Sequence, residues 1–472
     1  MNPLREIRAN PRQFAPSFLV VFIAGLFGTA IMQGIGILSA WMTSAEVIDE
    51  SGTARILIAL VGLTFFVIAL FVSSIVIANT FSIIIAGRGR QLALLRLIGA
   101  SSKRLRRSAA LEGLIIAVPS VIAALLVSTA LAGLTLALLG DQIRYDAGLL
   151  NVEVFLPAVA TLLVTWYAAY LGARRISGIS PVEATSQTVE HGPEDLRSSK
   201  RSLTTAIVLL GVGLVLLLGG AAAGVVMQIP LGLPIATIGG AVSFLGFIIG
   251  NPWILPPLQS LVGRLLGRTA SSRLAAKTIA RHPTRSARTV IGLVIGVTLI
   301  VMFATAMTSF RTQLEVYAEM LGHRGLEADG DAVLTVVDQT MMFFLGMVVF
   351  SVIIAVIGVA NALMLSVRHR TQEIGLLMAL GQTPRQVRTM VLSESLQLSV
   401  TGCVVALPLG VFYGWIGALA VIAPLTGFFG PSLSWWVLIV VVVGSILAVA
   451  VASRRPARAA TSVNPVEALE AV

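Results

Sequence analysis

The sequence has few charged residues and only one cysteine. Charged residues make up 12% of its 472 positions, whereas a soluble domain carries about 25%. Its mean hydropathy is +0.93. This composition predicts an integral membrane protein. Cys403 is the single cysteine and lies in an apolar run, so an intrachain disulfide and a cysteine metal cluster are excluded, and a small packed residue is expected there.

Residues that carry catalysis or bind nucleotides are also scarce. The four histidines are His191, His282, His323 and His369, all in expected loops. None of them has a second histidine at metal-ligand spacing. Lysine occurs only at Lys103, Lys200 and Lys277. None of the three completes the Gly-x-x-x-x-Gly-Lys-Ser/Thr loop that cradles nucleotide phosphates. We therefore expect no enzyme activity, metal or cofactor in this chain, with any ATP and magnesium held by a separate subunit.

The net charge of +11 does not indicate nucleic-acid binding. The basic residues do not gather in one soluble domain but lie between apolar runs, as the topology of a membrane protein requires. No nucleic-acid partner is expected.

Ten apolar runs are long enough to cross a bilayer, whose core of about 30 Å needs about 20 helical residues. They cover residues 15–40, 56–86, 108–138, 154–172, 204–226, 233–256, 289–310, 341–367, 389–424 and 432–453. The ninth run is long for one helix. Pro408 and Pro424 are expected to kink or break it, and its last part is a candidate re-entrant segment.

Lysine and arginine predict the orientation of these spans. With the N-terminus inside, the inside segments hold 29 of the 33 basic residues. They are residues 1–14, 87–107, 173–203, 257–288, 368–388 and 454–472. This bias predicts that both termini are cytoplasmic. The longest outside loop, 311–340, has room for one amphipathic helix and a turn at Gly322 or Gly330. It is too short for a large extracellular domain.

One pattern occurs twice, 282 positions apart, in what we define as the first signature (residues 78–114) and the second signature (residues 360–396). The first contains Ala78, Asn79, Arg88, Gln91, Leu94, Leu95, Gly99, Arg106, Glu112 and Leu114. The second contains Ala360, Asn361, Arg370, Glu373, Leu376, Leu377, Gly381, Arg388, Glu394 and Leu396. A Pro-Val-Glu-Ala string also recurs, at residues 181–184 and 465–468.

Because five spans lie between the signatures, the spans that enter them point the same way, which is a parallel repeat. We therefore expect an all-α membrane protein of two parallel-repeated four-helix halves joined by a central helix pair. The predicted division is a first half at 1–186, a cytoplasmic linker at 187–203, a central two-span pair at 204–256 and a second half at 257–472. Small-residue pairs such as Gly220/Gly224 and Gly246/Gly250 indicate close helix packing within the chain, with self-dimerisation as the alternative.

Each signature predicts a short helix with an apolar face. Gly99 and Gly381 are expected to end it as C′ residues, and Ser101 and Thr383 to cap the next helix. We interpret this helix as a docking element for a separate ATPase, with an interfacial membrane anchor as the alternative. The candidate coupling residues are Gln91, Leu94, Leu95, Gly99, Glu373, Leu376, Leu377 and Gly381.

Four polar residues at matching repeat positions are candidate hinge or gate residues: Glu112, Glu394, Asn79 and Asn361. The alternative for each glutamate is a carboxylate near a helix N-terminus, paired with Arg106 or Arg388. The alternative for each asparagine is an interhelical hydrogen bond.

The second signature resembles that of a known family. Residues 372–381 read Gln-Glu-Ile-Gly-Leu-Leu-Met-Ala-Leu-Gly, which is similar to the E-I-G-x-L-x-A-L-G signature of FtsX-like ABC transporter permeases. Residues 90–99 are a looser version, with Gln91 in place of the acidic residue. The Pro-Val-Glu-Ala strings look like that family as well. Ten spans with two such domains resemble bacitracin-type and lantibiotic-type peptide exporter permeases, without their large extracellular domain.

The resemblance implies the permease subunit of an ABC transporter in a bacterial cell membrane. Two copies of a cytoplasmic ATPase and membrane lipid would be its partners, and an amphipathic, peptide or lipid-like substrate would be exported or extracted from the membrane. Antimicrobial peptides belong to that class. The rival hypothesis is a relay that does not transport and that signals the state of the ATPase to an extracellular cell-wall hydrolase or a membrane sensor kinase. The looser first signature implies that the second docking site is the stronger.

Overall fold

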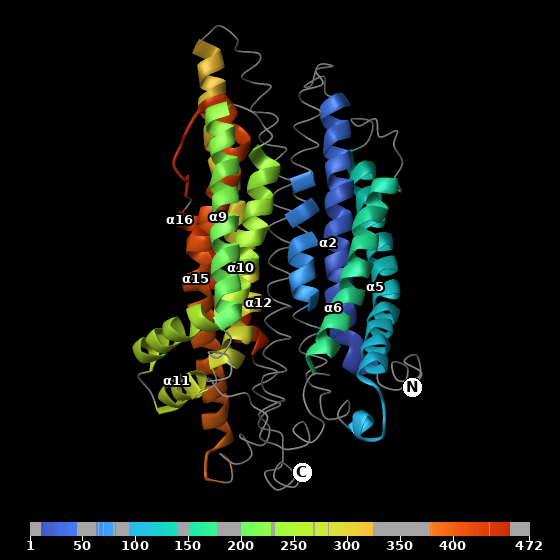
Figure 1. Cartoon of the computed structure of the whole chain (residues 1–472). Coiled ribbons are helices and arrows are strands. Elements are labelled where there is room, and N and C mark those ends of the chain that lie inside the picture. The colour runs from blue at the N-terminus through green and yellow to red at the C-terminus, as the bar shows by residue number, and fades with distance from the viewer. Residues whose placement is uncertain are drawn as a thin grey trace.

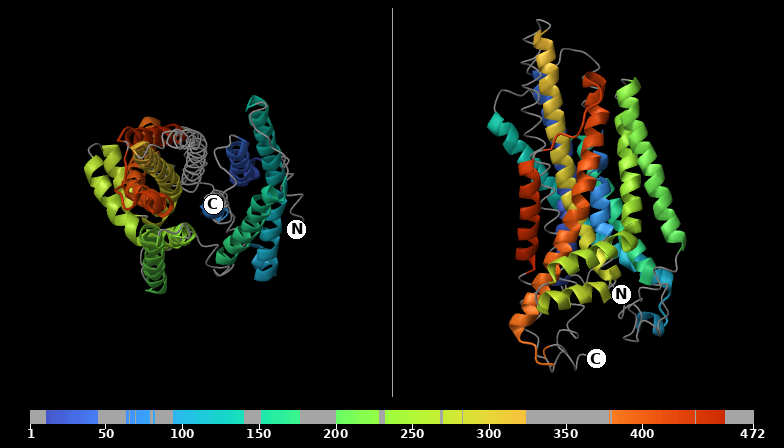
Figure 2. Two further views of the ribbon diagram at one scale, coloured as in Figure 1. Left: turned by 90° about the horizontal axis from the view of Figure 1, so that it is seen from above. Right: turned by 90° about the vertical axis from the view of Figure 1, so that its left-hand side faces the viewer.

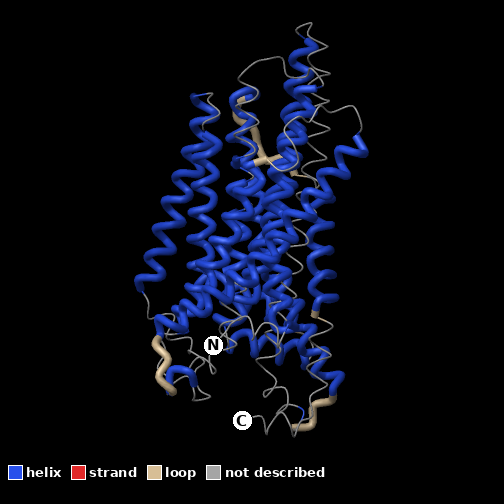
Figure 3. The backbone as a smooth tube through the Cα atoms, turned by 90° about the vertical axis from the view of Figure 1, so that its right-hand side faces the viewer, coloured by secondary structure: helices blue, strands red, loops and turns tan. Residues whose placement is uncertain are grey.

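The computed structural model describes residues 11–44, 63–78 except 65 and 69, 81, 94–139, 151–176, 200–227, 232–267, 270–281, 283–323, 378, 380–433 and 435–453. Every regular element among them is an α-helix (Figures 1 and 3). The labelled helices are α2 (Pro11–Ser44), α5 (Ser102–Leu139), α6 (Val152–Ile176), α9 (Lys200–Met227), α10 (Gly232–Leu266), α11 (Ala270–Arg281), α12 (Pro283–His323), α15 (Pro384–Thr426) and α16 (Trp435–Ala452).

Seven of these helices, α2, α5, α6, α9, α10, α12 and α15, contain segments long and apolar enough to cross a membrane. The chain is therefore a multi-pass membrane protein. Two shorter apolar helices, Phe66–Ala78 and Trp435–Val451, lie within the second and tenth predicted spans. The eighth predicted span, 341–367, lies outside the described residues. The number of ten spans therefore stays a prediction.

The described helices form two bundles (Figures 1 and 2). In the first, α2 packs against both α5 and α6; in the second, α12 packs against both α15 and α16, so the contacts follow one pattern. Val21, Ala117 and Ala169 belong to the core of the first bundle. Val294 and Ala406 belong to the core of the second. The first turns of α5 and of α15 lie at the same end of the molecule, which we call the signature end (Figure 1, bottom).

The helix Phe66–Ala78 connects the two bundles. The ring of Phe71 meets the ring of Phe244 on α10 edge to face, with centroids 6.3 Å apart. Phe244 in turn meets Tyr413 of α15 at 6.1 Å. Val72 belongs to the same buried cluster as Phe27 of α2 and Ile291 of α12. The core therefore continues from one bundle into the other.

Helix α15 excludes one of the two expected outcomes, a break of the ninth span at its prolines; a kink there stays a prediction. It runs as one helix from Pro384 to Thr426, with Pro408 and Pro424 inside it. The Pro408 nitrogen has no hydrogen to donate to the helical hydrogen bond, and packing against α12, α9 and α10 stabilises the helix there. The predicted re-entrant part is helical as well. The segment that turns back along the bundle is 427–433, which follows the helix (Figure 2).

Polar contacts fix the segment 427–433. Trp415 Nε1 donates to the carbonyl of Phe429 at 2.9 Å, and the Thr308 hydroxyl donates to the carbonyl of Ser432 at 2.7 Å. The backbone N–H of Ser432 donates to Ser309 Oγ at 3.1 Å. Partners of this kind are what a non-helical backbone needs in an apolar surrounding.

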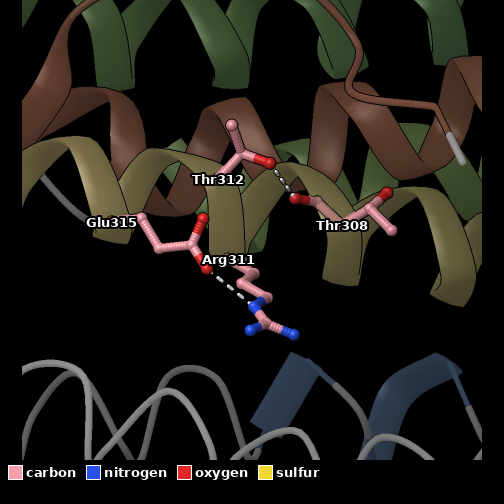
Figure 4. A network of polar contacts seen from close by, with 4 residues as sticks. All are labelled: Thr308, Arg311, Thr312 and Glu315. Carbon is pink, nitrogen blue, oxygen red and sulfur yellow. Dashed lines mark hydrogen bonds and ion pairs between the residues drawn. The ribbon is translucent and has the colours of Figure 1, made fainter.

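Helix α12 corrects the expectation for the outside loop 311–340. It continues without a break to His323, so residues 311–323 prolong a spanning helix instead of forming a separate one. Gly322 lies inside this helix and makes no turn, and Gly330 is outside the described residues. An exposed ion pair between Arg311 and Glu315, at 2.8 Å and one turn apart, supports the extension (Figure 4).

The helices α9 and α10 form an antiparallel pair with their backbones in contact. Small residues recur every seven positions on both helices, at 206, 213 and 220 and at 232, 239 and 246. A Cβ atom at Gly213 would collide with the backbone nitrogen of Ser243, and one at Gly239 with that of Leu217. The expected close packing of helices is therefore found. The small residues that allow it recur every seven positions, whereas the predicted glycine pairs are four positions apart. Gly224 instead approaches Ala420 of α15.

Substitution of Gly213 by alanine should separate α9 from α10. We expect the free energy of unfolding to fall by about 1–3 kcal/mol, because the added methyl group overpacks a backbone contact. The matched control is Gly219→Ala on the same helix, where a Cβ meets nothing within 4 Å; alanine there should stabilise by about 0.5–1 kcal/mol. Unfolding followed by tryptophan fluorescence in detergent measures both, and equal stability of the two variants would contradict the close contact.

Candidate functional site

The turn in the first signature has a fixed backbone geometry. A helical turn at 94–97 ends at Gly99, whose φ is +99°. The Gly99 N–H donates to the carbonyl of Arg96 at 3.0 Å, and the Ala100 N–H donates to that of Leu95 at 2.9 Å. This pair of bonds is the Schellman motif, in which glycine avoids the steric penalty of positive φ. The predicted C′ role of Gly99 is confirmed.

The second signature ends in the same way. Gly381 has a φ of +95°, and its N–H donates to the carbonyl of Met378 at 3.0 Å. The predicted C′ role of Gly381 is therefore confirmed too. A Cβ at either glycine would meet nothing within 4 Å, so backbone conformation, not space, requires glycine here.

The predicted caps are present at both turns. Ser101 Oγ accepts from the N–H of Arg104 at 3.3 Å. Thr383 and Gln386 form a reciprocal capping box, in which the Thr383 N–H donates to Gln386 Oε1 at 2.8 Å. Each capped helix continues directly as a spanning helix, α5 or α15. The turns are therefore attached to the membrane region without a flexible joint.

The structure places only part of the predicted coupling set. The side chain of Leu94 is half exposed and that of Leu95 is partly buried. Gln91, Glu373, Leu376 and Leu377 lie outside the described residues.

Two residues outside the predicted coupling set are the most exposed of the described large apolar residues at these turns. Ile98 is 80% exposed and Leu380 is 74% exposed. They are 282 positions apart, each directly before its C′ glycine. The apolar residues of the predicted coupling set end at Leu95 and Leu377, although Ile98 and Leu380 follow three residues later at helical spacing. An apolar residue before a C′ glycine in both copies was the signal that could have found them.

The predicted hinge residues are only partly placed. Glu112 and Glu394 lie in the third turns of α5 and α15 and are partly buried, on helices of different bundles (Figure 1). Glu112, Glu394, Arg106 and Arg388 each take part in a polar or electrostatic interaction. Asn79 and Asn361 lie outside the described residues. The hinge role of all four stays a prediction.

Helix α11 packs against the first turns of α15. The buried Ala275 contacts Met390 and Val391 in a small cluster. Gln397 Nε2 donates to the carbonyl of Ser272 at 3.0 Å. These contacts hold the start of α15, which follows the turn at Gly381, against α11.

Within the described part of the chain, no three histidine, cysteine, aspartate or glutamate side chains come close enough to hold a metal ion. The described turns offer exposed apolar side chains on rigid supports. Such a site is suited to binding a protein surface.

Comparison with known proteins places these turns in a family. The model described as "FtsX-like permease C-terminal" matches residues 63–181 and 345–465, together about half of the chain. The two matches begin 282 positions apart, which is the spacing of the two signatures. The chain belongs to the FtsX-like permease family. Both described turns, at Gly99 and Gly381, fall inside the matched regions.

Individual relatives agree with this assignment. The chain is 32% identical over 154 residues to the ABC transporter permease YtrF of Bacillus subtilis, which is 30% of this chain and 35% of YtrF. It is 36% identical over 120 residues to the uncharacterized ABC transporter permease YknZ of the same organism, 25% of this chain and 28% of YknZ. It is 39% identical over 83 residues to the macrolide export ATP-binding/permease protein MacB of Photorhabdus laumondii, which is 17% of this chain and 13% of MacB. The chain thus covers about a third or less of each relative.

Replacement of Gly381 by valine should destabilise the start of α15. The left-handed conformation costs an L-residue about 1–2 kcal/mol, and the Val387 N–H, which donates to the Thr383 carbonyl at 3.1 Å, should exchange with deuterium about tenfold faster. Gly381→Asn should change the rate less, because asparagine tolerates this conformation. Gly417→Ala, at an open helical position, is the control. Unchanged exchange in the valine variant would show that the turn is not held at positive φ.

Proposed function

We propose that this FtsX-like permease is the transmembrane subunit of an ABC transporter and couples a separate ATPase to the movement of an amphipathic or lipid-like substrate. One observation carries the proposal. An exposed apolar residue, Ile98 or Leu380, precedes a glycine at positive φ in each half. Each of these turns leads through a capped helix directly into the membrane region.

The length of the supporting helices suits the transmission of force. α5 has 38 residues and α15 has 43. At 1.5 Å per residue, each is about 60 Å long, roughly twice the thickness of a bilayer core. A displacement imposed on the turn by an ATPase would therefore move the whole helix as one lever. The helices packed against α15, among them α12, α9 and α10, would respond to it directly.

We infer a pair of ATPase subunits from the presence of two such turns. We propose that the halves are a parallel repeat and that each docks one copy of the ATPase at the signature end. Similar helix contacts in the two bundles support the repeat. The excess of basic residues in the predicted inside segments supports a cytoplasmic position for this end.

The substrate proposal rests on the apolar character of the spans. Exposed side chains on the outer surfaces of α5 and α9 are apolar, such as Leu126, Leu134 and Val215. A substrate that enters from the bilayer needs no hydrophilic route. Relatives of the chain include proteins named for macrolide export and pyoverdine export, and export of a peptide or lipid-like compound is our proposal for this chain.

Aspartate at the exposed apolar positions should weaken the docking of the ATPase. We expect Ile98→Asp or Leu380→Asp alone to lower its affinity about tenfold or more, since burying such a side chain contributes about 1.5–3 kcal/mol. The double variant should lose the ATPase. Leu138→Asp is the control, because Leu138 is 79% exposed but lies at the far end of α5. Affinity is measured by titration of the purified permease with the ATPase, and full binding by the double variant would refute the docking site.

The second docking site should be the stronger of the two. Glu373 stands where the first signature has Gln91, and α11 supports the helix that follows the second turn. We expect Leu377→Asp to reduce ATPase affinity more than Leu95→Asp does. Equal losses in the same titration would remove the proposed asymmetry.

The ATPase activity of the complex in nanodiscs tests the transport proposal. Stimulation by added amphipathic peptides or lipids is the expected result. A lack of stimulation, together with a cell-wall hydrolase or sensor kinase that copurifies with the complex, would instead indicate a relay.

A further inference from the structure

The last part of α10 and helix α11 form a hairpin that lies across the signature end of the second bundle (Figures 1 and 2). We call residues 252–267 and 270–281 the elbow hairpin. Its first helix contains Pro252, Pro256 and Pro257, which account for its bend away from the spanning part of α10. The sequence patterns ended the sixth span at residue 256, and the helix instead continues to Leu266. The elbow hairpin is thus helical where a loop was expected.

One side of the elbow hairpin is fixed to the bundle. Ser272, Ala275 and Ile279 are buried, and Gln397 of α15 binds the carbonyl of Ser272. Between the two helices of the hairpin, a Cβ at Gly263 would lie 3.0 Å from the methyl group of Ala276. The hairpin is therefore a packed part of the fold.

The other side of the elbow hairpin exposes leucines. Leu261 is 53% exposed, and Leu265, one helical turn later, is 66% exposed. The part of α10 before Pro252 is about 20 residues long, enough to cross a bilayer core, so we expect these leucines near the lipid headgroups. Leucines at this depth can insert among acyl chains.

Cations accompany these leucines. Arg264, Arg273 and Lys277 have exposed side chains, and Nε of Arg273 donates to the carbonyl of Gly267 at 3.1 Å, which holds that side chain at the turn of the hairpin. Residues 196–314 contain no aspartate or glutamate, whereas residues 257–288 contain seven basic residues. Helix α15 packs against α11 through Met390 and Val391. The acidic residue of α15 closest to these two in the sequence is Glu394, which is partly buried.

We propose that the elbow hairpin binds the headgroup of an anionic phospholipid, with Arg264, Arg273 and Lys277 as the headgroup contacts and Leu261 and Leu265 among the acyl chains. Basic side chains next to an apolar strip match the two parts of such a lipid. Attraction between surface cations and an anionic leaflet is worth about 1 kcal/mol for each cation, which corresponds to about a fivefold preference. This proposal does not depend on the ATPase.

Spin-labelled lipids in nanodiscs test the charge requirement. The wild-type chain should retain labelled phosphatidylglycerol in preference to phosphatidylcholine. Each of Arg264→Gln, Arg273→Gln and Lys277→Gln should lower that preference by up to about fivefold, and the triple variant should lower it furthest. The matched control is the triple variant Lys103→Gln, Arg104→Gln and Arg107→Gln, which removes three exposed cations at the same end on α5. Equal effects of the two triple variants, or no preference in the wild type, would overturn the lipid site.

A label on the hairpin distinguishes a lipid from a protein partner. Because Cys403 is the single cysteine, Cys403→Ala with Leu265→Cys gives one labelling site. A spin label there should be accessible to oxygen and protected from an aqueous nickel chelate, with no ATPase present. Exposure to the nickel chelate that disappears only when the ATPase is added would show that the hairpin is a protein contact and would refute the lipid proposal.

Discussion

The hydrogen-bonding requirement of the backbone in a bilayer underlies the described structure. An N–H or carbonyl group without a partner is costly in hydrocarbon, so each spanning segment must bond internally as a helix. Where the backbone is not helical, other groups must therefore supply its hydrogen-bond partners. The segment 427–433 takes them from Trp415, Thr308 and Ser309. The turns at Gly99 and Gly381 take them from the preceding helical turn.

Backbone hydrogen bonds and helix caps make the two turns at Gly99 and Gly381 rigid, although these turns lie in predicted inside segments. A helix that ended in a loose loop would not carry a displacement into the membrane, whereas a glycine at positive φ followed at once by a capped helix leaves little freedom. α15 is stiffened further, because α11 lies against its first turns and the elbow hairpin follows from α10. The second half therefore joins three elements near its turn: the proposed docking residue, the lever and the proposed lipid contact.

Close packing of small residues determines how the central helices assemble. The glycines of α9 and α10 let two backbones touch, and Gly224 lets α9 approach Ala420 on α15. The pair thus becomes part of the second bundle. The connection to the first bundle runs through aromatic rings, from Phe71 to Phe244 to Tyr413. Aromatic pairs in this arrangement stabilise a contact by about 0.5–1.5 kcal/mol beyond their buried area.

Local chemistry explains what the sequence could predict. Apolar runs of spanning length predicted most of the described helices, and glycine followed by a hydroxyl residue predicted both turns with their caps. Those features depend on neighbours within about five residues. The continuation of α10 to Leu266 and the extension of α12 to His323 depend on what packs alongside, and the patterns erred there. Packing also decides that Pro408 does not break α15.

The sequence by itself determined that this is a helical membrane protein with one signature used twice, because hydrophobic length and turn chemistry are encoded locally. Only the tertiary structure decided that Ile98 and Leu380 are exposed and that the elbow hairpin leaves Leu265 beside Arg264 on an uncovered surface. The exposure of a side chain depends on whether other parts of the chain pack against it, and those parts are distant in the sequence.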